Sequence, residues 1–254
     1  MQNRFLIFDM DGVLIDVAKS YQQAIKKTIE YILKNKYRIK TTVKPQDIEA
    51  MKAIPGFNND WDLSFELLRL LSEGVKRKEF SKKAMLVSNQ VRESKEYQYI
   101  KDMFQSYYLG NNLFYQVYNR ESPIEFSKGL ITNEVLLIDL AVLNLLAQKY
   151  RLGIATSRPR FEALFALKNL KVTPDIIEEK YIVAQEDAVR EKPAPDPLLE
   201  AKTRMKATKP IYIGDSINDT IASQKANMPC IFIGIDKLGD IQVTDVNNIK
   251  EVLL

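Results

Sequence analysis

The feature that most constrains the fold is a set of short, continuous apolar runs separated by helical patterns. The strong runs lie at residues 5–8, 152–155, 211–213 and 230–233, with a weaker one at 181–183. Such runs are typical of strands buried on both faces of a parallel sheet. Helical patterns alternate with them at residues 139–150, 160–169, 197–205 and 217–226. This alternation predicts an α/β fold with a doubly wound parallel sheet.

The segment between the first and second strong runs has a different pattern. From Val17 to Leu33, apolar residues recur at steps of three and four, which predicts a long helix with Asp16 as its N-cap. Further helical patterns cover residues 60–71 and 84–108. We therefore predict a core formed by residues 1–16 and 130–254, with a second, smaller, all-helical domain at residues 17–129.

Composition excludes several classes of function. The chain has no histidine, which excludes a Ser-His-Asp hydrolase, a zinc hydrolase and a histidine phosphatase. Lys and Arg number 37 against 33 Asp and Glu, an excess too small to indicate a nucleic-acid partner. The apolar runs are too short for a membrane span or a signal peptide, so we expect no membrane partner. The single cysteine, Cys230, lies in an apolar run and is expected to be buried; its isolation suits a cytoplasmic protein.

Two pairs of acids follow predicted strands. Asp9 and Asp11 come directly after the first run, and residues two apart on extended backbone point the same way. Asp215 and Asp219 follow the run at 211–213, and a spacing of four places residues on one face of a helix. Converging carboxylates repel unless a cation joins them or one is protonated, and such pairs hold Mg²⁺ through oxygen. Solvated acids or turn formers are the alternative interpretation.

Two more polar clusters follow strand ends. Thr156 and Ser157 come after the run at 152–155, where a hydroxyl and backbone N–H groups can form an anion site. An N-cap for the next helix is the alternative. Lys192 precedes three alternating prolines that restrict the loop, although a lysine is more often a solvated surface charge. All four clusters lie where open α/β sheets bind ligands.

In this order, the four clusters resemble the motifs of the haloacid dehalogenase superfamily: DxD, a Thr or Ser, a Lys, and GDxxxD. The resemblance covers the whole predicted core, and the helical insert resembles the cap of the phosphoglycolate-phosphatase-like branch within subfamily I. Two positions depart from the pattern. Ser157 lies where relatives often carry Asn, and Asn227 lies where Gly is common before the last core strand.

The resemblance implies a Mg²⁺-dependent phosphatase that hydrolyses a small phosphorylated metabolite. Asp9 would be the nucleophile that forms an aspartyl-phosphate. Asp11 would be the general acid and then the base. Mg²⁺ would bind Asp9, the backbone carbonyl of Asp11, and Asp215. Asp219 would support the metal through water or orient Lys192.

The remaining core residues would bind the phosphoryl group. Thr156 and Lys192 would hold it during transfer, with Ser157 beside them. Positive charge from the metal and Lys192 would offset charge on the phosphoryl oxygens.

Several alternatives remain open. A phosphomutase or a phosphonatase of the same superfamily would share the core residues, whereas a dehalogenase would lack Asp11. From a different class, a receiver domain also combines an acid pair, a hydroxyl and a Lys, but it has no later acid pair and no large insert. A catalytically silent binding protein is a further alternative. The sequence does not define the oligomeric state.

The predicted cap contains one unusual segment, residues 54–62, with the only tryptophan of the chain. Asn58, Asn59 and Trp61 are candidates for a substrate-specificity loop that closes over the site. The alternative is a turn in which Asn59 or Asp60 caps the next helix and Trp61 fills the core of the cap.

Overall fold

The computed structural model describes residues 4–236 and 238–254, and it divides the chain into two units. One unit comprises the chain up to Asp16 together with Val135–Leu254, and the other is Val17–Glu134. The first is an α/β unit built on a six-stranded parallel sheet, so the predicted fold class is confirmed. The second is helical. Residues 130–134, which the sequence assigned to the core, belong to the helical unit.

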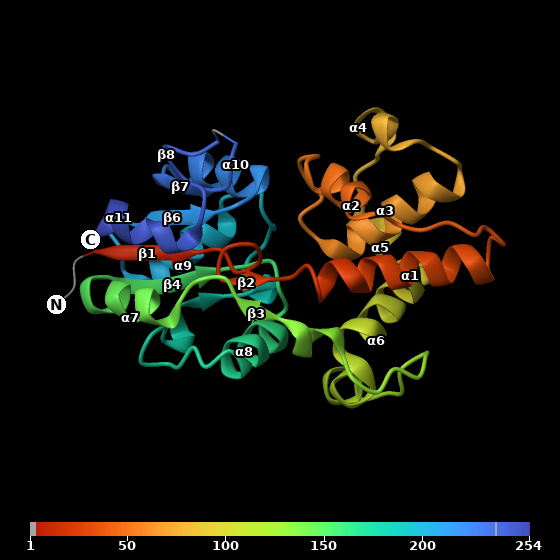
Figure 1. Cartoon of the computed structure of the whole chain (residues 1–254), viewed down its shortest axis with the longest axis horizontal. Helices are drawn as coiled ribbons and strands as arrows, with labels where there is room; N and C mark the ends of the chain where they lie inside the picture. Colours follow the sequence, from red (N-terminus) through yellow and green to blue (C-terminus); the bar gives the residue numbers. More distant parts are fainter. Residues whose placement is uncertain (1–3, 237) are drawn as a thin grey trace. The chain divides into compact units, whose positions relative to one another are not determined.

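The sheet of the first unit has the strand order β5-β4-β1-β6-β7-β8, with every pairing parallel (Figure 1). Its strands are β1 (Phe5–Phe8), β4 (Arg151–Ala155), β5 (Ile182–Val183), β6 (Ile211–Gly214), β7 (Cys230–Ile233) and β8 (Ile241–Val243). The central strand β1 is buried along its whole length, as its continuous apolar run predicts. Because β4 and β6 flank β1, the carboxyl ends of these three strands lie side by side.

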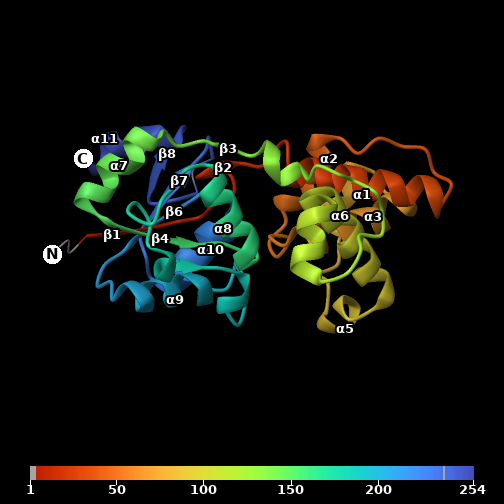
Figure 2. The same cartoon turned by 90° about the horizontal axis from the view of Figure 1, so that it is seen from below.

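Helices pack on both faces of the sheet, and Figure 2 shows α7 and α9 on opposite sides of it. The helices of this unit are α7 (Leu140–Lys149), α8 (Arg160–Asn169), α9 (Asp196–Met205), α10 (Ile217–Ala226) and α11 (Ile249–Leu253). Short 3₁₀ turns lie at Glu179–Tyr181, Gln185–Asp187 and Val246–Asn248. Ile7, Tyr212 and Cys230 point from their strands into one core cluster with α9 and α10. The burial of Cys230 expected from its apolar surroundings is observed.

Two very short strands mark the point where the chain leaves and re-enters this unit. β2 (Ile15–Asp16) pairs antiparallel with β3 (Val135–Leu136). Asp16 is therefore a strand residue, and its predicted role as a helix N-cap is wrong. The first helix begins at Tyr21, and Ser20 occupies the N-cap position without a side-chain capping bond. The Ser20 hydroxyl instead donates to Glu134 at 2.9 Å.

The helical unit is built on α1 (Tyr21–Asn35), which packs against α3 (Asp60–Ser72) and α6 (Lys95–Tyr118). Its shorter helices are α2 (Pro45–Lys52), α4 (Phe80–Lys83) and α5 (Asn89–Arg92), with 3₁₀ turns at Arg77–Glu79 and Leu130–Asn133. The helix predicted at residues 84–108 differs in the structure. It is divided between α5 and α6, and α6 is broken at Gly110, where the backbone turns to φ +72°.

Among the residues that the structure describes, no helix is both long enough and apolar enough to cross a membrane. Asn227 ends α10 in the left-handed conformation with φ +52°. Asn is one of the few residues other than Gly that adopt this conformation readily, which explains why it can replace the Gly of relatives.

Candidate active site

The site residues predicted in the core gather at the carboxyl edge of the central strands. Asp9 directly follows β1, Thr156 directly follows β4 and Asp215 directly follows β6. The backbone N–H of Asp9 donates to Ile213 of β6 at 2.8 Å, and that of Thr156 donates to Val183 of β5 at 3.0 Å. These bonds continue the sheet by one residue, so the positions of the first polar side chains are set by the sheet itself.

Asp9 is buried, with 6% of its surface exposed, and faces the ammonium group of Lys192 at 2.8 Å. Burial, followed by the charge of Asp219, raises the pKa of Asp9 to about 7, although the charge of Lys192 opposes the shift. A carboxyl group in these surroundings needs additional positive charge to remain ionised. A cation bound beside Asp9 would therefore favour the ionised form of this carboxyl group, which is the form that a nucleophile requires.

Lys192 lies in the loop between β5 and α9, and its side chain is fully buried. Its ammonium nitrogen contacts Asp9 at 2.8 Å and Asp219 at 2.7 Å, and it donates to the Tyr212 hydroxyl at 3.0 Å. An ammonium group has three donors, so these three acceptors match them. Burial alone lowers the pKa of Lys192, but the charges of Asp219 and Asp9 outweigh it and hold that pKa above its usual 10.5. Lys192 is a fixed cation and not a solvated surface charge.

Asp219 orients this lysine. Its Oδ1 atom accepts from Lys192 at 2.7 Å and from the Tyr212 hydroxyl at 2.6 Å. Its Oδ2 atom accepts from the backbone N–H and the hydroxyl of Ser216, at 3.0 and 2.5 Å, as part of the capping box that begins α10. Burial opposes ionisation of Asp219, but Lys192 and these hydrogen bonds outweigh it and hold the pKa of Asp219 below 3.8. Tyr212 is a residue of this network that the sequence did not indicate.

Carboxylate oxygens of Asp9, Asp215 and Asp219 lie within 4.8 Å of one another, close enough to surround one ion. Hard cations such as Mg²⁺ prefer this donor set. Gly12 makes room for the cluster, because a Cβ atom at that position would collide with the Asp215 carboxylate, and its backbone lies at φ +77°. These residues fit a divalent cation. Because both oxygens of Asp219 already accept two hydrogen bonds each, Asp9 and Asp215 are the better direct ligands.

Asp11 is half-buried and is bound by a residue that the sequence did not single out for a role. The Nε atom of Arg158 donates to Asp11 Oδ1 at 2.6 Å, and a second guanidinium nitrogen contacts the same oxygen. Arg158 is 1% exposed. Arg158 directly follows Thr156 and Ser157 in the sequence, which places it beside the predicted site, but nothing local shows that its partner lies 147 residues away.

Thr156 is buried and its hydroxyl accepts the backbone N–H of Arg158 at 3.2 Å. The alternative interpretation, in which Thr156 or Ser157 caps the next helix, is wrong, because Pro159 occupies the N-cap position of α8. The turn therefore keeps its hydroxyl groups near the strand end. A role of Thr156 and Ser157 in phosphate binding stays a prediction.

A family model described as haloacid dehalogenase-like hydrolase matches residues 118–233, which include Thr156, Lys192 and Asp215. The solved structure of phosphatase Tt82 from Thermococcus thioreducens is 25% identical, with a TM-score of 0.70 over 97% of each chain. The chain belongs to the haloacid dehalogenase superfamily. The resemblance inferred from the four motifs is thus confirmed, and the protein is a hydrolase of that superfamily.

Two further comparisons concern a solved structure and a protein that matches this chain over part of its length. A putative phosphoglycolate phosphatase from Lactobacillus delbrueckii subsp. bulgaricus superposes with a TM-score of 0.65 at 16% identity, over 100% of this chain and 99% of that chain, which shows a shared fold. An imidazoleglycerol-phosphate dehydratase from Phytophthora nicotianae is 28% identical over 229 residues. Those residues are 87% of this chain and 41% of that protein, so the chain spans less than half of that relative's length.

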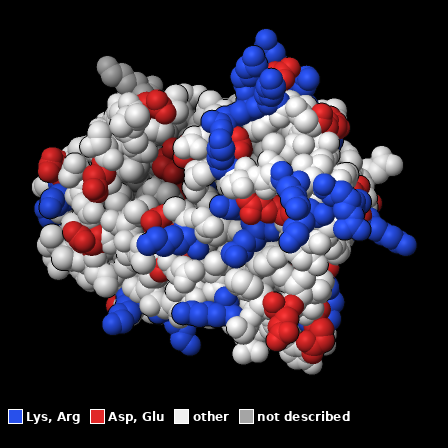
Figure 3. Space-filling model, turned by 45° about the vertical axis from the view of Figure 1, so that its right-hand side comes forward, with Lys and Arg blue, Asp and Glu red and all other residues white. Residues whose placement is uncertain are grey.

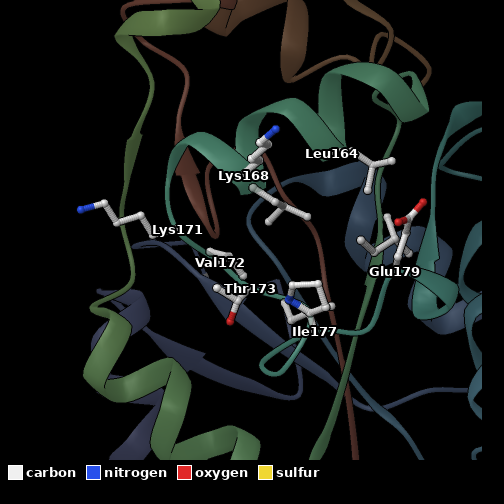
Figure 4. Close-up of a pocket in the computed structure, with 10 residues that line it drawn as sticks. Leu164, Lys168, Lys171, Val172, Thr173, Ile177 and Glu179 are labelled. Carbon is white, nitrogen blue, oxygen red and sulfur yellow. The ribbon is translucent and has the colours of Figure 1, made fainter.

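The α/β unit also has a cavity of about 370 Å³ beside α8, which Figure 4 shows. Its lining is mainly apolar and includes Leu164, Val172 and Ile177, with Lys168 and Glu179 among its polar members. None of the predicted site residues lines it. The cavity is therefore separate from the carboxylate and lysine cluster.

The candidate specificity residues lie in the helical unit that corresponds to the superfamily's cap. The Asn59 side chain accepts the backbone N–H groups of Trp61 at 3.0 Å and of Asp62 at 3.3 Å, so Asn59 caps α3. Trp61 is buried, and Lys101 lies 3.6 Å above its ring. Asn58 is half-buried. Asn59 and Trp61 thus have structural roles within the cap, and contact with substrate stays a prediction for all three.

Charged residues are distributed unevenly between the two units of the chain. Lys and Arg outnumber Asp and Glu in the cap unit, and the reverse holds for the core unit. Figure 3 shows Lys and Arg side chains gathered over part of the face in view. The excess of positive charge on the cap unit favours anionic ligands.

Proposed function

We propose that the protein is a Mg²⁺-dependent phosphatase that acts on a small phosphorylated metabolite through an aspartyl-phosphate. One observation carries the proposal. Asp9, a buried carboxyl group with a raised pKa, directly contacts a fully buried lysine and belongs to a cluster of acids that fits a divalent cation. Phosphoryl transfer needs a positioned nucleophile and concentrated positive charge, and this arrangement supplies both.

In the first step, an Asp9 carboxylate oxygen attacks the phosphorus atom, and the bond from phosphorus to the ester oxygen breaks. Asp11 gives its proton to the leaving oxygen, so the products are an alcohol and phosphorylated Asp9. In the second step, Asp11 takes a proton from water while that water attacks the phosphorus atom. The bond between phosphorus and Asp9 then breaks, which releases inorganic phosphate and restores both carboxyl groups.

The other polar groups hold the phosphoryl group during transfer. Lys192 is fixed by Asp219 and Tyr212, so its charge does not reorganise as the phosphoryl oxygens gain charge. Thr156 and Ser157 offer hydroxyl donors at the end of β4. Bound Mg²⁺ would supply the positive charge that keeps Asp9 ionised and that offsets charge on the phosphoryl oxygens.

Residues of the cap would select the leaving group, with Asn58, Asn59 and Trp61 as candidates. The names printed for similar proteins provide probes for this selection. Phosphoglycolate is the substrate named for one structural neighbour, and imidazoleglycerol phosphate is named for the partly matched relative. Both are small phosphate monoesters. A cytoplasmic location is proposed on the single buried cysteine of the chain.

The test is a screen of phosphorylated metabolites that includes these two probes, with release of inorganic phosphate measured with and without Mg²⁺. We expect release that requires Mg²⁺ and is lost in Asp9→Asn. Release by Asp9→Asn at the wild-type rate would refute the assignment of the nucleophile. A mutase or a silent binding protein would show no net release from any ester.

A further inference from the structure

Arg158 is a large, buried cation at the candidate site that the proposed mechanism does not use. It lies in the turn between β4 and α8, next to Thr156 and Ser157, and only 1% of its surface is exposed. A charged side chain is almost never fully buried unless it is paired. Its position therefore requires a specific partner.

The backbone of Arg158 is fixed at both of its polar groups. Its N–H donates to the Thr156 hydroxyl at 3.2 Å, and its carbonyl accepts from the N–H of Gln185 at 2.8 Å. The side chain reaches across from β4 to the segment after β1, where its Nε atom donates to Asp11 Oδ1 at 2.6 Å. The guanidinium group thus lies among the residues that the proposed reaction uses.

The charges around Arg158 indicate what its guanidinium group could bind. The acids after β1 and β6 are Asp9, Asp11, Asp215 and Asp219. Among the described residues, Lys192 and Arg158 are two buried cations that contact acids of this group. The ammonium group of Lys192 is already shared among three acceptors. An incoming phosphate monoester adds further negative charge to this crowded group of acids. A guanidinium fork is well matched to the paired oxygens of a phosphate, more so than an ammonium group.

We propose that Arg158 is a phosphate-binding residue and that the phosphoryl group of the substrate displaces Asp11 from it. Without substrate, Asp11 occupies the guanidinium and keeps this buried cation paired. When the phosphoryl group binds, it takes over the N–H donors of Arg158, and the Asp11 side chain is released towards the leaving-group oxygen. This inference rests on the proposed function, since it assigns a ligand to a residue of that site.

The simpler alternative is that Arg158 only positions Asp11 and never binds phosphate. The two interpretations differ in what they predict for the affinity of inorganic phosphate. A residue that only positions Asp11 affects turnover and leaves phosphate affinity unchanged. A phosphate ligand determines that affinity directly, in the absence of any reaction.

The experiment measures binding of inorganic phosphate to the Mg²⁺-loaded protein by titration calorimetry. We expect Arg158→Gln to weaken phosphate binding at least about tenfold, which corresponds to about 1.4 kcal/mol. Arg158→Lys retains the charge without the fork and should be intermediate. Arg160→Gln is the matched control, because Arg160 begins α8 and bonds to Ile182 and Asp187 instead. It should bind phosphate as the wild type does.

A second arm tests the displacement itself. Asp11→Asn removes the competitor for the guanidinium, so we expect it to tighten phosphate binding more in the wild-type background than in Arg158→Gln. Equal gains in the two backgrounds would overturn the exchange. Affinity for Mg²⁺ and the thermal melting curve of each variant establish that the metal site and the fold are retained.

Wild-type affinity for phosphate in Arg158→Gln would overturn the inference, as would failure of the wild-type protein to bind phosphate. Failure of the proposed phosphatase function would give a different result. In that case, phosphate would bind and depend on Arg158, but no ester would be hydrolysed. The two failures are therefore distinguishable.

Discussion

Tyr212→Phe tests the buried network that fixes Lys192. The Tyr212 hydroxyl donates to Asp219 Oδ1 at 2.6 Å and accepts from the Lys192 ammonium group at 3.0 Å, so the substitution removes two hydrogen bonds to charged partners. A hydrogen bond to a charged group contributes about 1.5–3 kcal/mol. The direct contact between Lys192 and Asp219 at 2.7 Å remains and limits the loss. We expect a loss of about 2 kcal/mol in the free energy of unfolding.

Tyr150→Phe is the matched control. The Tyr150 hydroxyl also lies in the α/β unit, but it donates to a neutral acceptor, the backbone carbonyl of Leu253, at 2.8 Å. A bond of that kind contributes about 1 kcal/mol. The assay is urea unfolding followed by circular dichroism, with thermal melting as a second measurement. For a chain of this size, about 2 kcal/mol corresponds to a shift in melting temperature of about 4–8 °C.

The two variants also differ in their expected activity. Tyr212→Phe should lower phosphate release because Lys192 is less firmly oriented, whereas Tyr150→Phe should leave it unchanged. Equal stability losses in the two variants would refute the reasoning, since the charged partners would then add nothing. So would a Tyr212→Phe protein as stable and as active as the wild type.

Three further predictions concern the metal site and the cap. Gly12→Ala places a Cβ atom on the Asp215 carboxylate and should abolish measurable Mg²⁺ binding; calorimetry that shows wild-type affinity would contradict this. Because burial raises the pKa of Asp9 to about 7 and a metal ligand must be deprotonated, Mg²⁺ affinity should rise between about pH 6 and pH 8 with release of a proton, and a flat profile would exclude Asp9 as a ligand. Asn59→Ala removes the cap of α3 and should cost about 1 kcal/mol of stability. Asn58→Ala is its neighbour control, and unchanged ester selectivity in both variants would end the specificity-loop hypothesis.

The parts of the fold that the sequence predicted are those determined by local pattern. β1, β4, β6 and β7 coincide with continuous apolar runs, and the helices between them begin and end within one residue of the predicted bounds. The candidate site followed from the same logic, since Asp9 and Asp215 extend strands that are neighbours in a parallel sheet. A polar residue at a buried strand end is visible in the sequence as an interruption of the run.

The parts that were missed depend on contacts between distant residues. Ser20 lies at the start of α1, but its hydroxyl bonds to Glu134, 114 positions away, so a capping rule based on neighbours selects the wrong residue. β2 has two residues, too few for a periodic pattern, and exists because it pairs with β3. Gly110 breaks α6 within an otherwise helical sequence. The pairing of Arg158 with Asp11 likewise arises only from the order of the strands.

Phosphorylation of Asp9 itself is the most direct test of the proposed reaction. The Mg²⁺-loaded protein is mixed with a phosphate ester that it hydrolyses, and the reaction is quenched rapidly. Borohydride then reduces any acyl phosphate to the alcohol, and the modified residue is located by mass spectrometry. We predict homoserine at position 9, formed only when both Mg²⁺ and ester are present. Continued release of phosphate with an unmodified Asp9, or with the modification on a different carboxylate, would contradict the mechanism.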